Sequence, residues 1–294
     1  MFLSPEVIAS LSSMELRAKF VVEGFLTGLH KSPYHGFSVE FSEHRQYMPG
    51  DDLKRLDWKV YGKTGKYFIK QYEEETNLKA YILLDASNSM GYKSTGTSIT
   101  KLAYASYLGA ALSYLLIQQR DAVGLAIYDS DIRTFLRPRS TMLYARELMK
   151  ELEHARPQGI TNTAGSLHML AERIDRRGLI ILLSDCFDEP EHIIGALKHF
   201  RHKGHEVLVL HILDPLERTF DFPADAVFQD LESDEKLSTQ PWHIKKAYQD
   251  AMQNFLILLK EQCRNNLIDY LLLETSTPFD KGLATYLRRR AMMR

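Results

Sequence analysis

Three oxygen-bearing side chains follow one apolar segment of the chain at two-residue steps. Asp85, Ser87 and Ser89 come directly after the run Ala80–Leu84, which is continuous enough in its hydrophobicity to form a buried strand. In an open α/β sheet, ligands bind beyond the carboxyl ends of the strands, so these oxygens would emerge where a site forms. One carboxylate and two hydroxyls are hard ligands that suit Mg²⁺ or Mn²⁺ better than Zn²⁺. The spacing favours a divalent cation site over the alternative that these side chains only cap the next helix.

Two further segments carry oxygens of the same kind. The loop Gly159–Thr163 offers a threonine hydroxyl, from Thr161 or Thr163, directly before a helical pattern. Asp185 follows a second apolar run, Leu179–Leu183. Because the carboxyl ends of parallel strands meet at one edge of a sheet, these side chains can approach the first three. These segments therefore predict one site for Mg²⁺ or Mn²⁺ that takes its ligands from Asp85, Ser87 and Ser89, from a threonine of this loop and from Asp185.

The elements that must position these residues follow from the alternation of apolar runs and helical patterns from about residue 80 onward. This alternation predicts an α/β fold with a mostly parallel sheet. Strands are expected at Ala80–Leu84, Ala122–Tyr128, Leu179–Leu183, Val207–Leu213 and Ile268–Leu273. Helices are expected at Ile99–Gln119, Met142–His154, Ala164–Arg176, Glu191–Lys203, His243–Cys263 and Pro278–Arg294. The turn residues Asp129-Ser130-Asp131 predict a hairpin that leads to an antiparallel edge strand.

Residues 1–79 have a different sequence pattern from the rest of the chain. We expect a helical start at Pro5–Leu26, followed by a β-rich arm. Alternating patterns predict strands at Gly36–Phe41 and Lys66–Tyr72. Between them we expect a turn at residues 47–52, followed by the start of a helix. The segment Lys66–Glu75 should pair with the edge of the main sheet or lie beside it. Residues 80–294 then form the α/β domain, with an excursion from the sheet at about residues 214–242, where Asp, Glu, Pro and Ser are frequent.

The composition excludes several classes of protein. Of the 294 residues, 45% are hydrophobic and 26% are charged, so the chain is neither fibrous nor disordered throughout. A net charge of −1 gives no global attraction to nucleic acid or to an anionic membrane. The longest apolar stretch, Leu102–Ile117, is too short to span a membrane. Two distant cysteines fit a reducing compartment, and we expect a cytoplasmic protein.

The five predicted ligands resemble, in their order and spacing, the metal-ion-dependent adhesion site of von Willebrand factor A domains. The resemblance covers residues 80–213 and implies a doubly wound sheet. It also implies that Ser87 and Ser89 bind the metal directly, that Thr161 binds directly or through water, and that both aspartates hold metal-bound waters. Thr163 is the less favoured threonine, because the residue of that family usually follows the glycine closely.

The arm carries a second resemblance. Its ordered residues are Tyr47, Pro49, Gly50, Asp51 and Asp52, then Arg55, Asp57, Trp58 and Lys59, and then Thr64, Gly65 and Lys66. This set is similar to the uncharacterised family that is numbered fifty-eight among the catalogued domains of unknown function. Members of that family are commonly encoded beside MoxR-type AAA+ ATPases, which implies such an ATPase as a partner. Some members carry N-terminal membrane segments, a feature that we do not expect here.

Together these patterns predict a non-enzymatic, Mg²⁺-dependent protein-binding module that works with a MoxR-type ATPase in the maturation or regulation of another protein complex. An Asp or Glu of the partner would complete the metal's coordination. Tyr47, Arg55 and Trp58 are residue types common at binding hot spots, so the arm is a candidate second contact. The alternative for Trp58 is that it packs the arm onto the sheet.

Two other functions remain possible for the same strand end. One is a Mg²⁺-dependent phosphoesterase or phosphatase. A haloacid-dehalogenase-type phosphatase keeps a second Asp two residues after its nucleophile, and Ser87 stands at that position, which leaves no carboxylate for acid–base work. The other is a scaffold that binds no metal.

Overall fold

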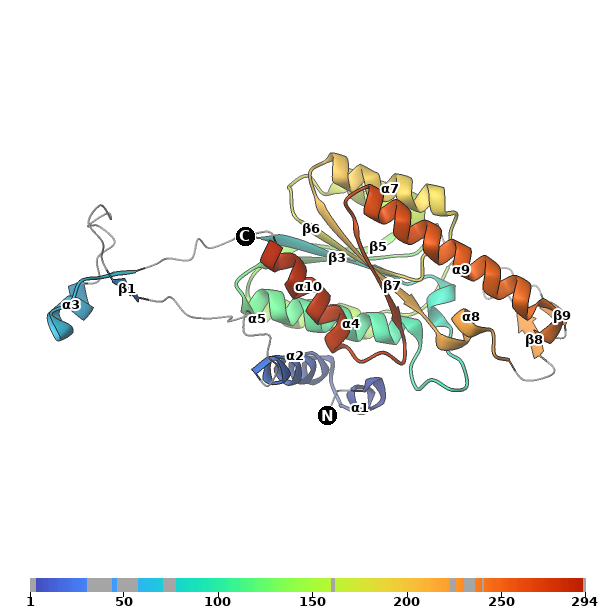
Figure 1. Ribbon diagram of the computed structural model, residues 1–294, viewed down its shortest axis with the longest axis horizontal. Helices are drawn as coiled ribbons and strands as arrows, with labels where there is room; N and C mark the ends of the chain where they lie inside the picture. The colour runs from blue at the N-terminus through green and yellow to red at the C-terminus, as the bar shows by residue number, and fades with distance from the viewer. Residues whose placement is uncertain are drawn as a thin grey trace.

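The computed structural model describes residues 4–30, 44–46, 58–70, 78–159, 162–222, 226–229, 236–239 and 241–292. Its centre is a six-stranded sheet with helices on both faces (Figure 1). The strands are β3 (Lys79–Asp85), β4 (Ala122–Tyr128), β5 (Ile132–Arg139), β6 (Leu179–Ser184), β7 (Glu206–Leu213) and β10 (Asp269–Glu274). One face carries α1 (Pro5–Ala9), α2 (Met14–His30), α4 (Lys101–Gln118), α5 (Met142–His154) and α10 (Asp280–Met292). The other face carries α6 (Thr163–Arg173), α7 (Pro190–His202) and α9 (Pro241–Asn265).

The order of the strands changes direction at the centre of the sheet. The order is β10-β7-β6-β3-β4-β5, in which every neighbouring pair is parallel except β4 and β5. The predicted doubly wound, mostly parallel sheet with an antiparallel edge strand is confirmed. Since the chain runs outward from β3 through β4 and β5 and then returns to the other side of β3, the carboxyl ends of β3 and β6 form the switch point where ligands bind in such folds.

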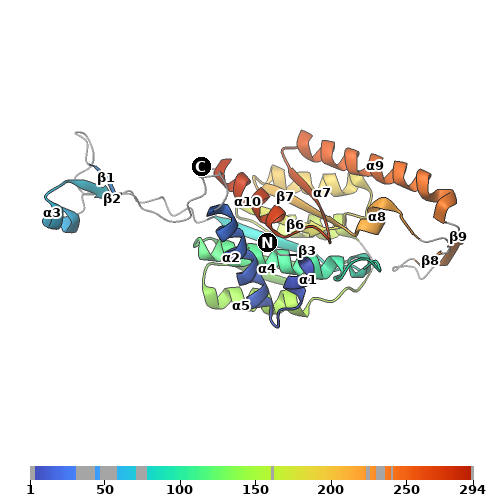
Figure 2. The ribbon, with the colours of Figure 1, turned by 60° about the horizontal axis from the view of Figure 1, so that its bottom comes forward.

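The apolar runs are buried on both faces of the sheet. In β3, Ala80, Ile82 and Leu84 pack toward α4, while Tyr81 and Leu83 pack toward α6 and α7. This arrangement explains why the strands read as continuous hydrophobic runs rather than as alternating ones. Figure 2 shows α4 between the sheet and the outer helices α2 and α5. No helix among the described residues is both long and apolar enough to cross a membrane.

The expected helical start is divided into two helices that belong to the main core. A short break at residues 10–13 separates α1 from α2. Ile8, Met14 and Val21 are buried in the same cluster as α4. The helix α6 ends at Arg173, three residues before its predicted end at Arg176. Ile174 takes an extended conformation there, and its side chain is buried in the core on the face of the sheet that α6 itself covers.

Two parts of the chain form small structures of their own. In the segment expected to leave the sheet, α8 (Pro215–Thr219) precedes an antiparallel pair, β8 (Ala226–Gln229) and β9 (Lys236–Thr239), which does not join the six-stranded sheet. In the arm, β1 (His44–Gln46) pairs with β2 (Phe68–Lys70), and α3 (Trp58–Thr64) lies between them in sequence.

The strand of the arm pairs differently from what the sequence predicted. The pairing expected between Lys66–Glu75 and the main sheet is wrong for the described residues of that segment, because the partner of β2 is β1. The chain also enters β3 at Lys79, the end of the strand opposite to Asp85. The strand predicted at Gly36–Phe41 and the turn at residues 47–52 lie outside the described residues.

A buried histidine on β7 predicts a loss of stability in acid. His211 is fully buried, with Nδ1 2.7 Å from the Tyr270 hydroxyl oxygen. Burial lowers its pKa to about 4, below the value of about 6.5 that an unfolded chain gives. Between these two values the unfolded state binds more protons than the folded state, so His211 by itself should lower the free energy of unfolding by roughly 3 kcal/mol as the pH falls from 6.5 to 4.

Urea unfolding at a series of pH values tests this prediction. As the pH falls from 6.5 to 4, wild type should lose roughly 3 kcal/mol of unfolding free energy relative to His211→Gln, whereas no such difference should develop between wild type and the exposed control His202→Gln. If wild type and His211→Gln show the same pH dependence, His211 does not cause the acid sensitivity.

Candidate metal centre

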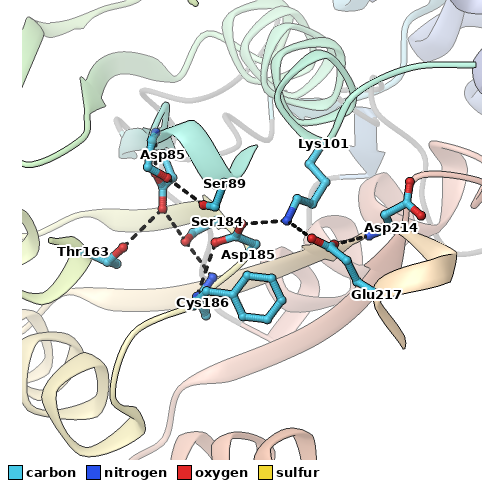
Figure 3. Close-up of polar contacts among 11 residues, drawn as sticks. Asp85, Ser89, Lys101, Thr163, Ser184, Asp185, Cys186, Asp214 and Glu217 are labelled. Atoms are coloured by element: carbon cyan, nitrogen blue, oxygen red, sulfur yellow. Dashed lines mark hydrogen bonds and ion pairs between the residues drawn. The ribbon is translucent and has the colours of Figure 1, made fainter. Parts of the chain in front are cut away.

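The carboxylate of Asp85 is the centre of a buried hydrogen-bond cluster at the carboxyl end of β3. Its Oδ1 accepts from the backbone N–H and the hydroxyl of Ser87, at 3.0 and 2.7 Å. Its Oδ2 accepts from the hydroxyls of Thr163 and Ser184, at 3.2 and 2.7 Å (Figure 3). Four donors from three segments of the chain therefore fix this side chain in one orientation.

The two predicted serine ligands lie side by side. The distance between Ser87 Oγ and Ser89 Oγ is 3.0 Å. Two adjacent ligands in an octahedron with bonds of about 2.1 Å, the geometry that Mg²⁺ requires, are about 3.0 Å apart. Since the Ser87 hydroxyl donates its proton to Asp85, its lone pairs are available to a cation. The donor set fits Mg²⁺ or Mn²⁺ both in chemistry and in spacing.

The residues just before the predicted threonine are held against the end of β3. The backbone N–H of Gln158 donates to the Ala86 carbonyl at 2.9 Å, and that of Asn88 donates to the Gly159 carbonyl at 3.1 Å. Thr161 lies outside the described residues. Thr163, the less favoured threonine of the sequence analysis, is buried as the first residue of α6, with its hydroxyl on Asp85.

This loop needs a glycine at position 159. Gly159 has a φ of +77°, and a Cβ atom there would lie 2.6 Å from Oδ2 of Asp129, which forms an ion pair with Arg133. We expect Gly159→Ala to lower the free energy of unfolding by about 1–3 kcal/mol, because the variant combines a left-handed backbone with a steric clash. Urea unfolding measures the change, and Gly96→Ala is the control because a Cβ atom there meets nothing within 4 Å. Equal losses in the two variants would contradict this role of Gly159.

The second predicted aspartate is paired with a lysine. Asp185 follows β6 and is fully buried. Its Oδ2 accepts from Lys101 Nζ at 2.8 Å, and its Oδ1 accepts from the backbone N–H of Phe187 at 3.3 Å. Burial raises the pKa of Asp85, and the nearby charge of Asp185 raises it further, to about 6. The structure thus brings the two predicted carboxylates within electrostatic reach of each other.

A chain of ionic contacts continues from Asp185 to α8. Lys101 Nζ also donates to Oε1 of Glu217 at 2.6 Å, and Oε2 of Glu217 accepts from the backbone N–H of Asp214 at 2.9 Å. The Asp214 carboxylate in turn accepts from Ser94 N–H and the Thr97 hydroxyl, both at 3.0 Å. Burial lowers the pKa of Lys101, but the two carboxylates raise it by more, so its pKa lies above the usual value and the ammonium is charged.

The sequence analysis missed four members of this cluster, and three of them left a signal. Asp214 directly follows the apolar run Val207–Leu213, as Asp85 follows Ala80–Leu84. Lys101 is the one charged residue in the apolar helix α4. Ser184 lies between the predicted strand Leu179–Leu183 and Asp185. Glu217 carried no signal, because its role depends on contacts with residues far away in the sequence.

The predicted ligands include hydroxyl groups as well as carboxylates. Among the described residues, no three His, Cys, Asp or Glu side chains are grouped so that they could hold a metal ion. A centre at this edge of the sheet therefore depends on the serine and threonine hydroxyls, which are oxygen ligands of the kind that Mg²⁺ accepts.

Of the three predicted arm contacts, only Trp58 belongs to the part of the chain that the structure describes. Trp58 is the first residue of α3. Tyr47 and Arg55 lie outside the described residues, so their predicted role in partner binding stays a prediction.

Comparison with known proteins finds one family model, described as "Protein of unknown function DUF58", that matches residues 43–255. Among curated proteins, the chain is 28% identical over 233 residues to "Uncharacterized protein Rv1480" of Mycobacterium tuberculosis, a match that covers 78% of this chain and 72% of the relative. "Uncharacterized protein Mb1516" of Mycobacterium bovis matches with the same identity and coverage.

Solved structures of similar shape share little sequence with this chain. The conserved hypothetical protein BatB from Bacteroides thetaiotaomicron has 18% identity and a TM-score of 0.49, with 73% of this chain and 99% of that chain covered. An aerotolerance-related membrane protein from Bacteroides fragilis has 17% identity and a TM-score of 0.49, with 72% and 99% covered. The SpRpn10 VWA domain has 12% identity and a TM-score of 0.42, with 69% and 92% covered.

Proposed function

The chain belongs to the DUF58 family of proteins of unknown function, and from this premise and the strand-end cluster we propose that it is a non-enzymatic, Mg²⁺-dependent protein-binding module. The pair of serine hydroxyls 3.0 Å apart beside the Asp85 carboxylate is the observation that carries the proposal. Ser87 and Ser89 bind the ion directly, and a threonine of the adjacent loop, Thr161 or Thr163, adds a third hydroxyl. Asp85 and Asp185 hold water on the ion.

The charges near the site favour a cation and an acidic partner group. The linked carboxylates are Asp85, Asp185, Asp214 and Glu217, and Lys101 is the ammonium among them. Asp85 and Asp185 lie at the predicted ion, and Lys101 shares its charge between Asp185 and Glu217. These three carboxylates and the ammonium have a summed charge of −2, which a bound Mg²⁺ neutralises, so the open coordination position accepts an Asp or Glu of a partner without strong net repulsion. The ion supplies a fixed positive charge for this contact.

The partner that the family resemblance implies is a MoxR-type AAA+ ATPase, which the protein would assist in the maturation or regulation of another protein complex in the cytoplasm. The arm supplies a second contact through Tyr47, Arg55 and Trp58, which are residue types that dominate binding energies at interfaces. An arginine there suits an acidic group that lies next to the one on the ion.

Binding between this protein and a purified MoxR-type ATPase from the same cell tests the proposal. In 2 mM MgCl₂ we expect binding that weakens at least tenfold in excess chelator or in the Ser87→Ala/Ser89→Ala variant, because the partner's carboxylate then loses its ligand. Ser113→Ala is the control, because its hydroxyl donates to Gly109 within α4. Binding of equal strength with and without Mg²⁺ would exclude the metal-dependent contact.

The alternative, a Mg²⁺-dependent phosphoesterase or phosphatase, has one feature in its favour, the carboxylate at the strand end. The side chain two residues later is Ser87, and its hydroxyl donates to Asp85, so it offers no base or acid for a leaving group. Hydrolysis of 4-nitrophenyl phosphate with and without Mg²⁺ separates the two functions. Turnover that depends on Mg²⁺ and is lost in Asp85→Asn would favour the enzyme.

A further inference from the structure

Lys101 occupies a place that is unfavourable for a positive charge. It is the first residue of α4, where the helix dipole repels cations, and its side chain is fully buried. Its Nζ lies 2.8 Å from Oδ2 of Asp185, 2.6 Å from Oε1 of Glu217 and 4.8 Å from the centre of the Phe187 ring. Two ion pairs therefore fix the Lys101 ammonium in place, and their attraction offsets the free energy that burial of the charge costs.

One of these partners is a predicted metal-site residue. An ammonium in contact with Asp185 reduces the negative charge that this carboxylate can offer to an incoming cation. Its ion pair of 2.8 Å also fixes the position of the Asp185 carboxylate (Figure 3). We infer that Lys101 is an internal counter-ion that sets the affinity of the strand-end site for divalent cations, lowering it in the free protein. This inference rests on the proposed function.

Glu217 determines how much of this charge acts on Asp185. It shares the ammonium with Asp185, and its other oxygen is fixed by the backbone N–H of Asp214 in the first turn of α8. If Glu217 loses its charge, Lys101 acts on Asp185 alone and opposes a divalent cation more strongly. Removal of Lys101 and removal of the Glu217 charge must then change metal affinity in opposite directions.

Titration of the full metal-free chain with Mn²⁺, measured by isothermal calorimetry, tests this inference. Lys101→Met keeps the length of the side chain and removes the charge, and it should lower the Kd for Mn²⁺ at least tenfold. Glu217→Gln keeps the shape and should raise the Kd at least threefold. The exposed lysine of the neighbouring loop gives the matched control, Lys93→Met, which should change the Kd less than twofold. Lys101→Arg restores the charge and should return the Kd to within threefold of wild type.

A purely structural role for Lys101 gives a different pattern. If the lysine only positioned Asp185, both Lys101→Met and Glu217→Gln would weaken Mn²⁺ binding, and that result would overturn the inference. If Lys101→Met fails to fold in chelator, its refolding is followed by circular dichroism as Mn²⁺ is added. Refolding at Mn²⁺ concentrations below the wild-type Kd supports the inference, and no refolding overturns it.

The same titrations separate this inference from the proposed function. If wild type binds Mn²⁺ and Lys101→Met binds it no more tightly, the inference fails and the proposed function stands. If wild type does not bind Mn²⁺ but Lys101→Met does, the lysine replaces the metal in this chain, so the inference stands and the Mg²⁺-dependent function fails. If neither protein binds Mn²⁺, both fail.

Discussion

Replacement of Ser87 and Ser89 together by alanine is expected to raise the Kd for Mg²⁺ or Mn²⁺ at least a hundredfold. Loss of residues that only support metal ligands already costs about 10- to 100-fold in affinity, and this variant removes two oxygens that face the ion directly. The remaining donors are a threonine hydroxyl and carboxylates that act through water. Calorimetry on metal-free protein at pH 7.5 should show about one site in wild type and no measurable heat of binding in the variant.

The control for this variant is another serine with a buried hydroxyl. Ser113 is as buried as Ser87, but its hydroxyl donates to a carbonyl within its own helix. Ser113→Ala should therefore keep the wild-type Kd within a factor of two. Identical Mn²⁺ binding in wild type and in the Ser87→Ala/Ser89→Ala variant would show that the two serines do not bind the ion.

The carboxyl edge of the sheet could be predicted from the sequence because the signal there is local. A continuous apolar run indicates a strand buried on both faces, and the residue that follows it must lie at the sheet edge. This reasoning correctly brought Asp85 and Asp185 to neighbouring strands, β3 and β6. The same reasoning, applied to Val207–Leu213, would have added Asp214 to the cluster.

The ionic part of the cluster could not be predicted in this way. Lys101 and Asp185 are 84 residues apart, and Lys101 and Glu217 are 116 residues apart, so only the folded chain brings them together. Helix propensity gives no reason to expect a buried lysine at the start of a helix, since the dipole disfavours it there. Local rules fail here because tertiary contacts offset the unfavourable local preference.

The arm shows a different limit. Alternation in the sequence correctly indicated a strand near Phe68–Lys70, but it could not identify the partner of that strand. A run of three residues carries too little hydrophobic pattern to specify which edge it pairs with. The expectation that the arm pairs with the main sheet rested on chain continuity alone. In the structure, β1 instead pairs with the backbone groups of β2.

Replacement of Asp85 by asparagine is expected to raise the stability of the metal-free protein. Burial and the charge of Asp185 raise the pKa of Asp85 to about 6, while an unfolded chain gives about 3.9. The folded state therefore binds more protons between these values, so stability falls as the pH rises through this range and the full penalty is present above pH 6. Asp85→Asn should unfold with a free energy roughly 2–3 kcal/mol higher than wild type at pH 8 in chelator.

The amide can keep the hydrogen bonds of the carboxylate. Its oxygen can accept from Ser87, and its nitrogen can donate to the hydroxyl oxygens of Thr163 and Ser184, which then act as acceptors. The variant should therefore match wild type at pH 4, where the carboxyl is protonated, and the difference should grow between pH 4 and 6. The acid sensitivity caused by His211 is present in both proteins and cancels in the comparison.

Urea unfolding of wild type, Asp85→Asn and the exposed control Asp131→Asn in chelator measures these differences. Asp131→Asn should follow wild type within about 0.5 kcal/mol at each pH, as expected for a surface substitution. Added Mg²⁺ should stabilise wild type at pH 8 and leave Asp85→Asn nearly unchanged, because the ion removes in wild type the repulsion that the substitution has already removed. A variant that is less stable than wild type at pH 8 in chelator would mean that Asp85 is a structural cap, whose hydrogen bonds outweigh the cost of its buried charge.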